Sequence, residues 1–116
     1  MKPDHAIDYL EFPSRDLEAT KAFFTALAGW NFQDYGPEYT AFEDGEATGG
    51  FYLSKAISSA DLGAPLVVLY HSDLEAVQEK VTGLGGKITK EIFSFPGGRR
   101  FQFAEPGGSE FAYWSE

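Results

Sequence analysis

The 116-residue chain contains no cysteine, and this absence removes several classes of function at once. Without a thiol, a protein has no disulfide bond, no thiol nucleophile and no thiolate metal ligand. The absence also suits a reducing compartment, so we expect a cytoplasmic protein. Long apolar runs are missing as well: none approaches the ~20 residues of a membrane helix, and no signal peptide or membrane partner is expected.

Positive charge is scarce. The chain has 9 Lys and Arg residues against 18 Asp and Glu residues, a net charge of −9. Nucleic acids bind cationic surfaces, so they are not expected partners. Histidine is limited to His5 and His71, and no Ser-His-Asp order or phosphate-binding glycine loop is present. In contrast, apolar residues make up 43% and aromatic residues 16%, enough to fill a core.

An internal repeat is the most informative feature of the chain. The tetrapeptide Asp-Leu-Glu-Ala occurs at Asp16–Ala19 and again at Asp73–Ala76, 57 positions later (73 − 16). Residues 16–31 and 73–88 are identical at seven of sixteen positions. Each copy follows an apolar run typical of a strand and precedes a glycine. We interpret this as a duplicated supersecondary unit, whose two halves would face each other across a cleft.

Periodicity predicts the same order of elements in both copies. The first copy predicts a strand at Ile7–Phe12, a helix capped by Ser14 or Asp16 and ended by Gly29, and strands at Trp30–Gln33, Tyr39–Glu43 and Gly49–Leu53. The second predicts a strand at Leu66–His71, a helix capped by Ser72 or Asp73 and ended by Gly85-Gly86, and strands at Lys87–Glu91, Arg100–Glu105 and Glu110–Trp114.

The predicted fold class is therefore α+β, with two tandem βαβββ modules in a single domain at 1–116. Module one covers about residues 6–53, a Ser/Ala-rich linker covers 54–64, and module two covers about residues 65–116. Beyond the helices, the repeat continues with an offset of 61. This offset pairs Phe42 with Phe103 and Tyr52 with Tyr113.

The paired βαβββ order resembles the vicinal oxygen chelate superfamily of glyoxalases, bleomycin resistance proteins and extradiol dioxygenases. Segments that support the resemblance are Phe24–Trp30, Leu84–Ile88 and the hairpin Phe103–Trp114 (F-A-E-P-G-G-S-E-F-A-Y-W). The resemblance implies a cupped sheet with helices on the outer faces and a homodimer. It implies less about activity, because this scaffold carries several chemistries and also non-enzymes.

The resemblance also implies where metal-dependent members hold their ion. Their His or Glu ligands come from the first and last strand of each module, the first lying seven residues before the aspartate that opens the helix. In this chain those positions are Tyr9, Phe51, Leu66 and Ala112. Three hydrocarbon side chains and a phenol do not match the ligands that divalent ions prefer, so we expect neither a metal nor another cofactor.

Side chains alternate along a strand, so residues of equal parity share a face. This rule predicts a ligand-binding cleft with aromatic walls and a few carboxylates. Its predicted lining is Tyr9, Glu11, Phe51, Leu53, Leu66, Val68, Tyr70, Glu110, Ala112 and Trp114. Glu11 and Glu110 could form an acid/base pair, but we favour a solvated position near a strand end for Glu11 and a place at a turn rim for Glu110.

Three functions remain open from the sequence. The first, which we favour, is a metal-free protein that is not an enzyme and binds a small aromatic or amphipathic molecule; the acidic surface would favour a cationic one. The second is a dimerising interaction module without a ligand. The third is a divergent lyase or dioxygenase of the glyoxalase type that uses His5, His71, Glu11 or Glu110. We rank them in that order.

Overall fold

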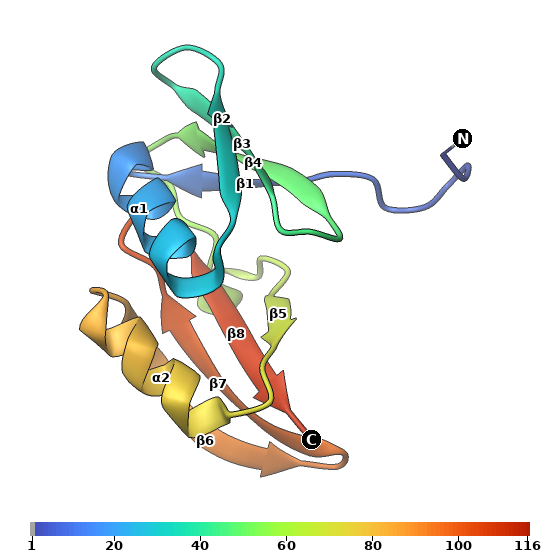
Figure 1. The fold of residues 1–116 in the computed structure, drawn as a ribbon, viewed down its shortest axis with the longest axis vertical. Helices are drawn as coiled ribbons and strands as arrows, with labels where there is room; N and C mark the ends of the chain where they lie inside the picture. The colour runs from blue at the N-terminus through green and yellow to red at the C-terminus, as the bar shows by residue number, and fades with distance from the viewer. Residues whose placement is uncertain (1) are drawn as a thin grey trace.

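The computed structural model describes residues 2–116 and contains two four-stranded sheets, each with one α-helix (Figure 1). The strand order is β1-β4-β3-β2 in the first sheet and β5-β8-β7-β6 in the second, which is the same order within each module. The predicted α+β class and tandem βαβββ topology are confirmed. The elements are β1 (Leu10–Ser14), α1 (Leu17–Ala28), β2 (Asn31–Asp34), β3 (Tyr39–Glu43), β4 (Thr48–Leu53), a 3₁₀ turn (Ala60–Leu62), β5 (Val67–Tyr70), α2 (Leu74–Gly83), β6 (Lys87–Phe95), β7 (Gly98–Ala104) and β8 (Glu110–Ser115).

Each helix begins at the aspartate that opens the repeat. Asp16 has an extended backbone, and its side chain accepts a hydrogen bond from the Ala19 N–H at 3.0 Å. Asp73 accepts one from the Ala76 N–H at 3.1 Å in the same way. An aspartate at this position satisfies a backbone donor that the first helical turn leaves unpaired. The repeated tetrapeptide is therefore a helix-start signal in both modules.

The two helices end differently. Gly29 follows α1 in the left-handed conformation (φ 72°), as predicted. Helix α2 ends at Gly83 with Leu84 as its cap, two residues before the predicted stop at Gly85, which carries the left-handed turn instead (φ 96°). Neither helix in residues 2–116 is long and apolar enough to cross a bilayer.

Both modules contribute to one hydrophobic core, built mainly from phenylalanine rings. Phe12 and Phe24 of module one lie 4.9 and 5.1 Å, between ring centroids, from Phe111 of module two. Phe23 of α1 lies 6.0 Å from Phe103. Helix α1 lies close to the second sheet as well as to its own (Figure 1). Because the core fills the helix side of both sheets, the opposite face of each sheet is open.

A buried carboxylate joins the two modules. Glu105, 2% exposed in the β7–β8 turn, accepts hydrogen bonds from the Thr20 hydroxyl of α1 and from the backbone N–H groups of Gly107 and Ser109. The Ser109 hydroxyl donates to the carbonyl of Pro13 in β1 at 2.7 Å. Burial raises the pKa of Glu105, although its three donors oppose that rise.

The strand register corrects part of the sequence alignment. Phe42 pairs with Gly49 across β3 and β4, whereas Phe103 pairs with Phe111 across β7 and β8. The offset is therefore 61 on the third strands (103 − 42), as predicted, but 62 on the fourth strands (111 − 49). The cause is the last turn, residues 105–109, which is one residue longer than its counterpart, residues 44–47. Tyr52 consequently corresponds to Trp114 and not to Tyr113.

Candidate functional site

The open face of the first sheet carries a hydrogen-bonded group of two tyrosines and a glutamate. The hydroxyls of Tyr9 and Tyr39 lie 2.7 Å apart, and Tyr39 donates to Oε2 of Glu11 at 2.8 Å. Gly50, paired with Glu11 across β1 and β4, lies beneath them, where a Cβ atom would collide with Tyr39. We call Tyr9, Glu11 and Tyr39 the tyrosine–glutamate cluster.

The cluster favours the neutral form of its central phenol. Partial burial, followed by the hydrogen bonds to Tyr9 and Glu11, raises the pKa of Tyr39 far above its usual value. Tyr39 therefore stays a hydrogen-bond donor at neutral pH and is not a general base. Glu11 is exposed, and in residues 2–116 no basic side chain forms an ion pair with it. The arrangement suits recognition of a donor group more than proton abstraction.

Phe51 does not belong to this face, and its predicted place in the cleft is wrong. It pairs directly with Phe12, so both rings point to the helix side, and Phe51 is 0% exposed. The one-residue difference between the two last turns caused the error, because a shift of one residue moves a strand residue to the other face. The residue at the corresponding place on the open face is Gly50.

On the open face of the second sheet, β5 and β8 place several predicted residues side by side. Val68 pairs with Ala112, and Tyr70 pairs with Trp114. Val68 and Tyr70 are exposed, Trp114 is half-buried, and Ala112 is buried. Leu66 is half-buried just before β5.

The same face carries aromatic and basic residues that the sequence prediction missed. Arg100 pairs with Trp114 on one side and with Phe93 on the other, so the three share the open face. The Phe95 ring lies 6.4 Å from Phe93 and 6.5 Å from Trp114. Tyr70 meets Trp114 edge-on at 5.3 Å. We call the set Tyr70, Phe93, Phe95, Arg100 and Trp114 the aromatic patch.

Glu110 has a structural position in this chain. It is 8% exposed and accepts hydrogen bonds from the Ala60 N–H of the linker, the Thr89 hydroxyl and the Gln102 amide. Burial raises its pKa, but the three donors outweigh that effect, so the pKa of Glu110 is lowered overall. Glu110 is the first residue of β8, next to the β7–β8 turn, and it is buried there. Glu110 instead fastens the linker to the second sheet.

Glu11 and Glu110 lie on the open faces of different sheets. Glu11 and Glu110 belong to separate hydrogen-bond networks, so they do not form an acid/base pair. Between β1 and β5 there is one apolar hollow of about 160 Å³, with Leu10, Val67 and Leu69 among its lining residues. Ligand pockets usually enclose roughly 300–1,000 Å³, so this hollow is too small for a typical ligand.

The residues at the superfamily's ligand positions do not fit a divalent metal ion. With the corrected register these positions are Tyr9, Gly50, Leu66 and Ala112, and the Tyr9 hydroxyl is already hydrogen-bonded to Tyr39. Within residues 2–116, no three His, Asp or Glu side chains come together as a metal site would require. His71 is engaged elsewhere: its Nδ1 accepts a hydrogen bond from the N–H of Asp73 at 2.9 Å.

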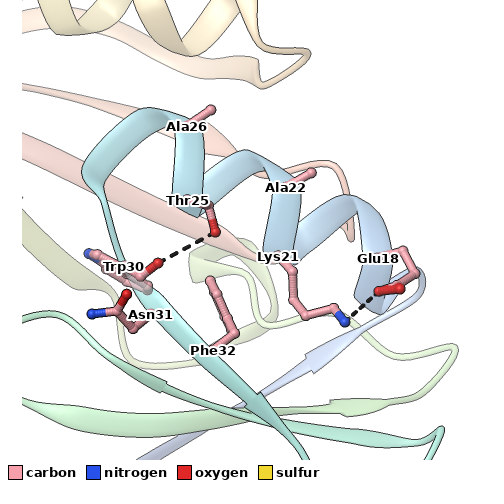
Figure 2. Close-up of a pocket in the computed structure, with 8 residues that line it drawn as sticks. All are labelled: Glu18, Lys21, Ala22, Thr25, Ala26, Trp30, Asn31 and Phe32. Atoms are coloured by element: carbon pink, nitrogen blue, oxygen red, sulfur yellow. Dashed lines mark hydrogen bonds and ion pairs between the residues drawn. The ribbon is translucent and has the colours of Figure 1, made fainter.

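A separate groove lies between α1 and β2 on the outer side of module one (Figure 2). Its basic residue, Lys21, is ion-paired with Glu18 and with Asp34. The Thr25 hydroxyl reaches the Trp30 carbonyl at 3.4 Å. Lys21 and Thr25 therefore already have partners, and none of the residues predicted to bind a ligand lines this groove.

Two signals in the sequence could have found the missed residues. Tyr39 pairs with Tyr52, which has the same parity as Gly50, so a correct register of β4 would have placed Tyr39 beside Glu11. Arg100 pairs with Trp114, and Gln102 pairs with Ala112, so alternation along β7 places Arg100 on the face of two predicted site residues. Strand β6 extends to Phe95 and not to Glu91 as predicted, and this extension adds Phe93 and Phe95 to the face.

Comparisons with known proteins identify relatives of the fold. A sequence model of the Glyoxalase/Bleomycin resistance protein/Dioxygenase superfamily matches residues 6–113. The fosfomycin resistance protein FosX from Mesorhizobium loti is 16% identical with a TM-score of 0.75, covering 97% of this chain and 92% of that one. No curated protein sequence matches the chain.

Two further solved structures have the same fold. The E126Q mutant of FosX from Listeria monocytogenes, complexed with Mn(II) and 1S,2S-dihydroxypropylphosphonic acid, has a TM-score of 0.77 at 14% identity, covering 96% of this chain and 90% of that one. Lactoylglutathione lyase from Agrobacterium tumefaciens has a TM-score of 0.70 at 17% identity, covering 98% and 96%.

Proposed function

Because the chain belongs to the Glyoxalase/Bleomycin resistance protein/Dioxygenase superfamily, we propose that it is a binding protein for a small aromatic or amphipathic molecule and that it works without the metal of its metal-dependent relatives. The observation that carries the proposal is the chemistry of the four ligand positions. They hold a hydrogen-bonded phenol, a glycine and two hydrocarbon side chains. A divalent ion needs His, Asp or Glu donors there.

The open faces support a binding role by their composition. Val68, Tyr70 and Trp114 are proposed as contact residues on the second sheet, beside the newly found Phe93 and Phe95. Tyr9 and Glu11 are proposed as the polar contacts on the first sheet. Aromatic rings next to a few hydrogen-bonding groups are typical of sites for small organic molecules. Leu66 lies at the margin, whereas Ala112 and Glu110 contribute shape and support to the face.

We also propose that a homodimer completes the site. In one chain the two half-sites are open, and large apolar side chains are exposed at the strands that border them: Tyr9 is 41%, Val68 39% and Tyr70 51% exposed. The segment before β1 extends away from the body of the chain (Figure 1), and its Ile7 is 86% exposed. A second copy would cover such surface, which isolated soluble monomers seldom leave exposed.

The deciding experiment combines metal analysis with a ligand screen. Protein purified without chelator is analysed for Zn, Ni, Mn and Fe, and then screened by thermal shift and calorimetry against aromatic and amphipathic compounds. We expect less than stoichiometric metal and at least one saturable ligand. Stoichiometric metal that binding depends on would replace this proposal with the glyoxalase-type enzyme. Analytical ultracentrifugation tests the dimer in the same preparation.

A second candidate function is an interaction module whose open faces are covered only by the second copy. The exposed tyrosines and Val68 favour this alternative as much as they favour a ligand. The two functions differ in one measurement: an interaction module would form a dimer in ultracentrifugation but bind none of the compounds in the screen. A cytoplasmic location, suggested by the lack of cysteine, belongs to both.

A further inference from the structure

Arg100 is an unusual cation in an acidic protein. It lies on β7 at the centre of the aromatic patch, where its guanidinium carbon is 5.2 Å from the centre of the Phe93 ring and 5.9 Å from that of Phe95. Both distances are within the range of cation–π attraction. The rings therefore hold the guanidinium on the open face of the second sheet.

This guanidinium has no carboxylate partner within the part of the chain that the structure describes. Its Nε is buried without a hydrogen-bond acceptor, and its one side-chain contact is a long one, 3.5 Å from Nη2 to Oε1 of Gln102. A guanidinium carries five N–H donors, and leaving them unpaired in a half-buried position costs free energy. The chain has 18 acidic residues, so a shortage of acids does not explain why Arg100 lacks a carboxylate partner.

The neighbouring arginine, Arg99, differs from Arg100 because it has an acidic partner. Arg99 points to the opposite face of β7, where both of its terminal nitrogens bond the carboxylate of Glu75, at 2.5 and 3.1 Å. Two adjacent arginines thus differ in one respect: one has a bidentate acid, and the other has aromatic rings and open donors. The bidentate pair of Arg99 with a carboxylate is the arrangement that Arg100 lacks.

A second cation lies next to Arg100, even though the chain as a whole is negative. The Lys90 ammonium lies 4.4 Å from the centre of the same Phe93 ring. Two acids border the patch, and both are engaged: Glu116 accepts the Tyr70 hydroxyl at 2.7 Å, and Glu110 accepts the Gln102 amide. The expectation of a cationic ligand, drawn from net charge alone, therefore does not apply to this face. An anion is the better match for it.

We propose that the aromatic patch binds a small aromatic carboxylate, with the acid group on the guanidinium of Arg100 and the ring against Trp114 and Tyr70. The inference rests on the proposed function and names the chemical class of its ligand. A planar carboxylate accepts two parallel hydrogen bonds from a guanidinium, and the aromatic side chains provide the apolar contact.

The test uses two probes of nearly the same shape, the anion 1-naphthoate and the neutral amide 1-naphthamide, titrated calorimetrically into the protein. Trp114 fluorescence gives a second readout, since Trp30 is buried in the core at 6% exposure. We expect naphthoate to bind at least about tenfold more tightly than the amide. Equal affinity for the two probes would overturn the carboxylate assignment and leave the proposed function standing. Binding of neither probe would overturn the ligand class, and the broader compound screen would then test the proposed function separately.

Three variants test whether Arg100 causes the preference for naphthoate over naphthamide. We expect Arg100→Gln to remove the preference for naphthoate, Arg100→Lys to keep part of it, and Arg99→Gln to keep all of it. Loss of the preference in Arg99→Gln but not in Arg100→Gln would overturn the assignment. Arg100→Gln relieves an unpaired cation, so its melting temperature should not fall, which separates lost binding from lost folding.

A second copy could instead supply the missing acid, for example from an exposed glutamate of the tyrosine–glutamate cluster. In that case Arg100→Gln would dissociate a dimer in ultracentrifugation, and naphthoate would not bind the wild-type protein. That result would overturn the ligand assignment. A dimer that persists in Arg100→Gln, together with lost naphthoate binding, supports it.

Discussion

The two modules share one backbone plan but carry opposite chemistry on their open faces. Both have the same strand order and an aspartate at the start of the helix. Module one displays the tyrosine–glutamate cluster, whereas module two displays rings around an arginine. The repeat therefore determines the backbone arrangement around each site, and the residues outside the repeated positions determine what the site can bind.

The cores of the modules also differ at one corresponding position. Gly49 of β4 corresponds to Phe111 of β8, since both pair with a phenylalanine of the third strand. In module two Phe111 fills the space itself. In module one the ring of Phe42 covers Gly49, so that a Cβ atom there would lie 2.5 Å from the Cζ of Phe42 and would overlap the Leu10 carbonyl oxygen.

The largest effect is expected from Gly49→Ala, which asks whether module one can accept even a methyl group where module two holds Phe111. The new methyl group would meet backbone at Leu10 and a buried ring at Phe42, and neither can move away freely. We expect a loss of about 3 kcal/mol in the free energy of unfolding, measured by urea titration. Gly83→Ala is the matched control, because nothing lies within 4 Å of its Cβ position. A neutral Gly49→Ala would show that β4 shifts easily.

The next effect concerns the joint between modules and is tested by Thr20→Val, which removes a donor from buried Glu105 while keeping the shape of the side chain. We expect a cost of about 1–3 kcal/mol at neutral pH. Because the pKa of Glu105 is raised, the folded state holds a proton that the unfolded state releases. Its contribution to stability therefore falls as pH rises from the unfolded value near 4.5 through the raised pKa.

The cost of Thr20→Val should accordingly be smaller at pH 5 than at pH 8, because a protonated Glu105 depends less on its donors. Urea titrations of wild type and variant across that range check this point. A cost that is the same across that range would mean that Glu105 is ionised throughout it, and the expected pH dependence would be wrong.

Glu110 belongs to the same hairpin as Glu105 but responds to pH in the opposite direction. Its lowered pKa makes its contribution present above the unfolded value near 4.5 and lost as pH falls through the lower folded value. We expect Glu110→Gln to cost about 1–2 kcal/mol at pH 7, since one carboxylate oxygen serves both Thr89 and Gln102. The difference from wild type should shrink below pH 4. Chemical denaturation at both pH values is the measurement.

The fold could be predicted from the sequence because its signals are local and repeated. The helix starts at Asp16 and Asp73, the stop at Gly29 and the strand Tyr39–Glu43 all depend on residues that are neighbours in the chain. Capping and alternation act within one element, so one sequence is enough to detect them. The start of β1 was placed three residues too early for the opposite reason: its bounds depend on pairing with β4.

The candidate site could be predicted only in part. The open-face residues of β5 and β8 were placed correctly relative to each other, because Leu66 to Tyr70 and Glu110 to Trp114 keep a simple alternation. Phe51 was misplaced because turn length, and not alternation, sets the face of β4 relative to β8. The partners of Glu110 could not be foreseen either, since they come from the linker and from β6, far apart in the chain.

The smallest effect is expected from Gly50→Ala, which gives module one the alanine that module two has at position 112. The new Cβ atom would lie 2.5 Å from the Cζ of Tyr39 and 2.9 Å from the hydroxyl of Tyr9, but both belong to the ends of movable side chains. We expect a cost of about 0.5–1 kcal/mol and an opened tyrosine–glutamate cluster. The reciprocal change, Ala112→Gly, should cost at least as much, because it raises the backbone entropy of the unfolded state and removes a fully buried methyl group.

The two substitutions differ in their effect on tyrosine ionisation. Opening the cluster exposes Tyr39 and removes its hydrogen bond to Glu11, so the pKa of Tyr39 should fall toward its ordinary value near 10 in Gly50→Ala. Ultraviolet absorbance during alkaline titration should then detect one additional tyrosine in the ordinary range. Burial raises the pKa of Tyr113 to about 12, and that group should not change. If the tyrosine titration of Gly50→Ala matched that of wild type, the raised pKa of Tyr39 would not depend on the absence of a side chain at position 50. The difference between the two open faces would then have a cause other than this glycine.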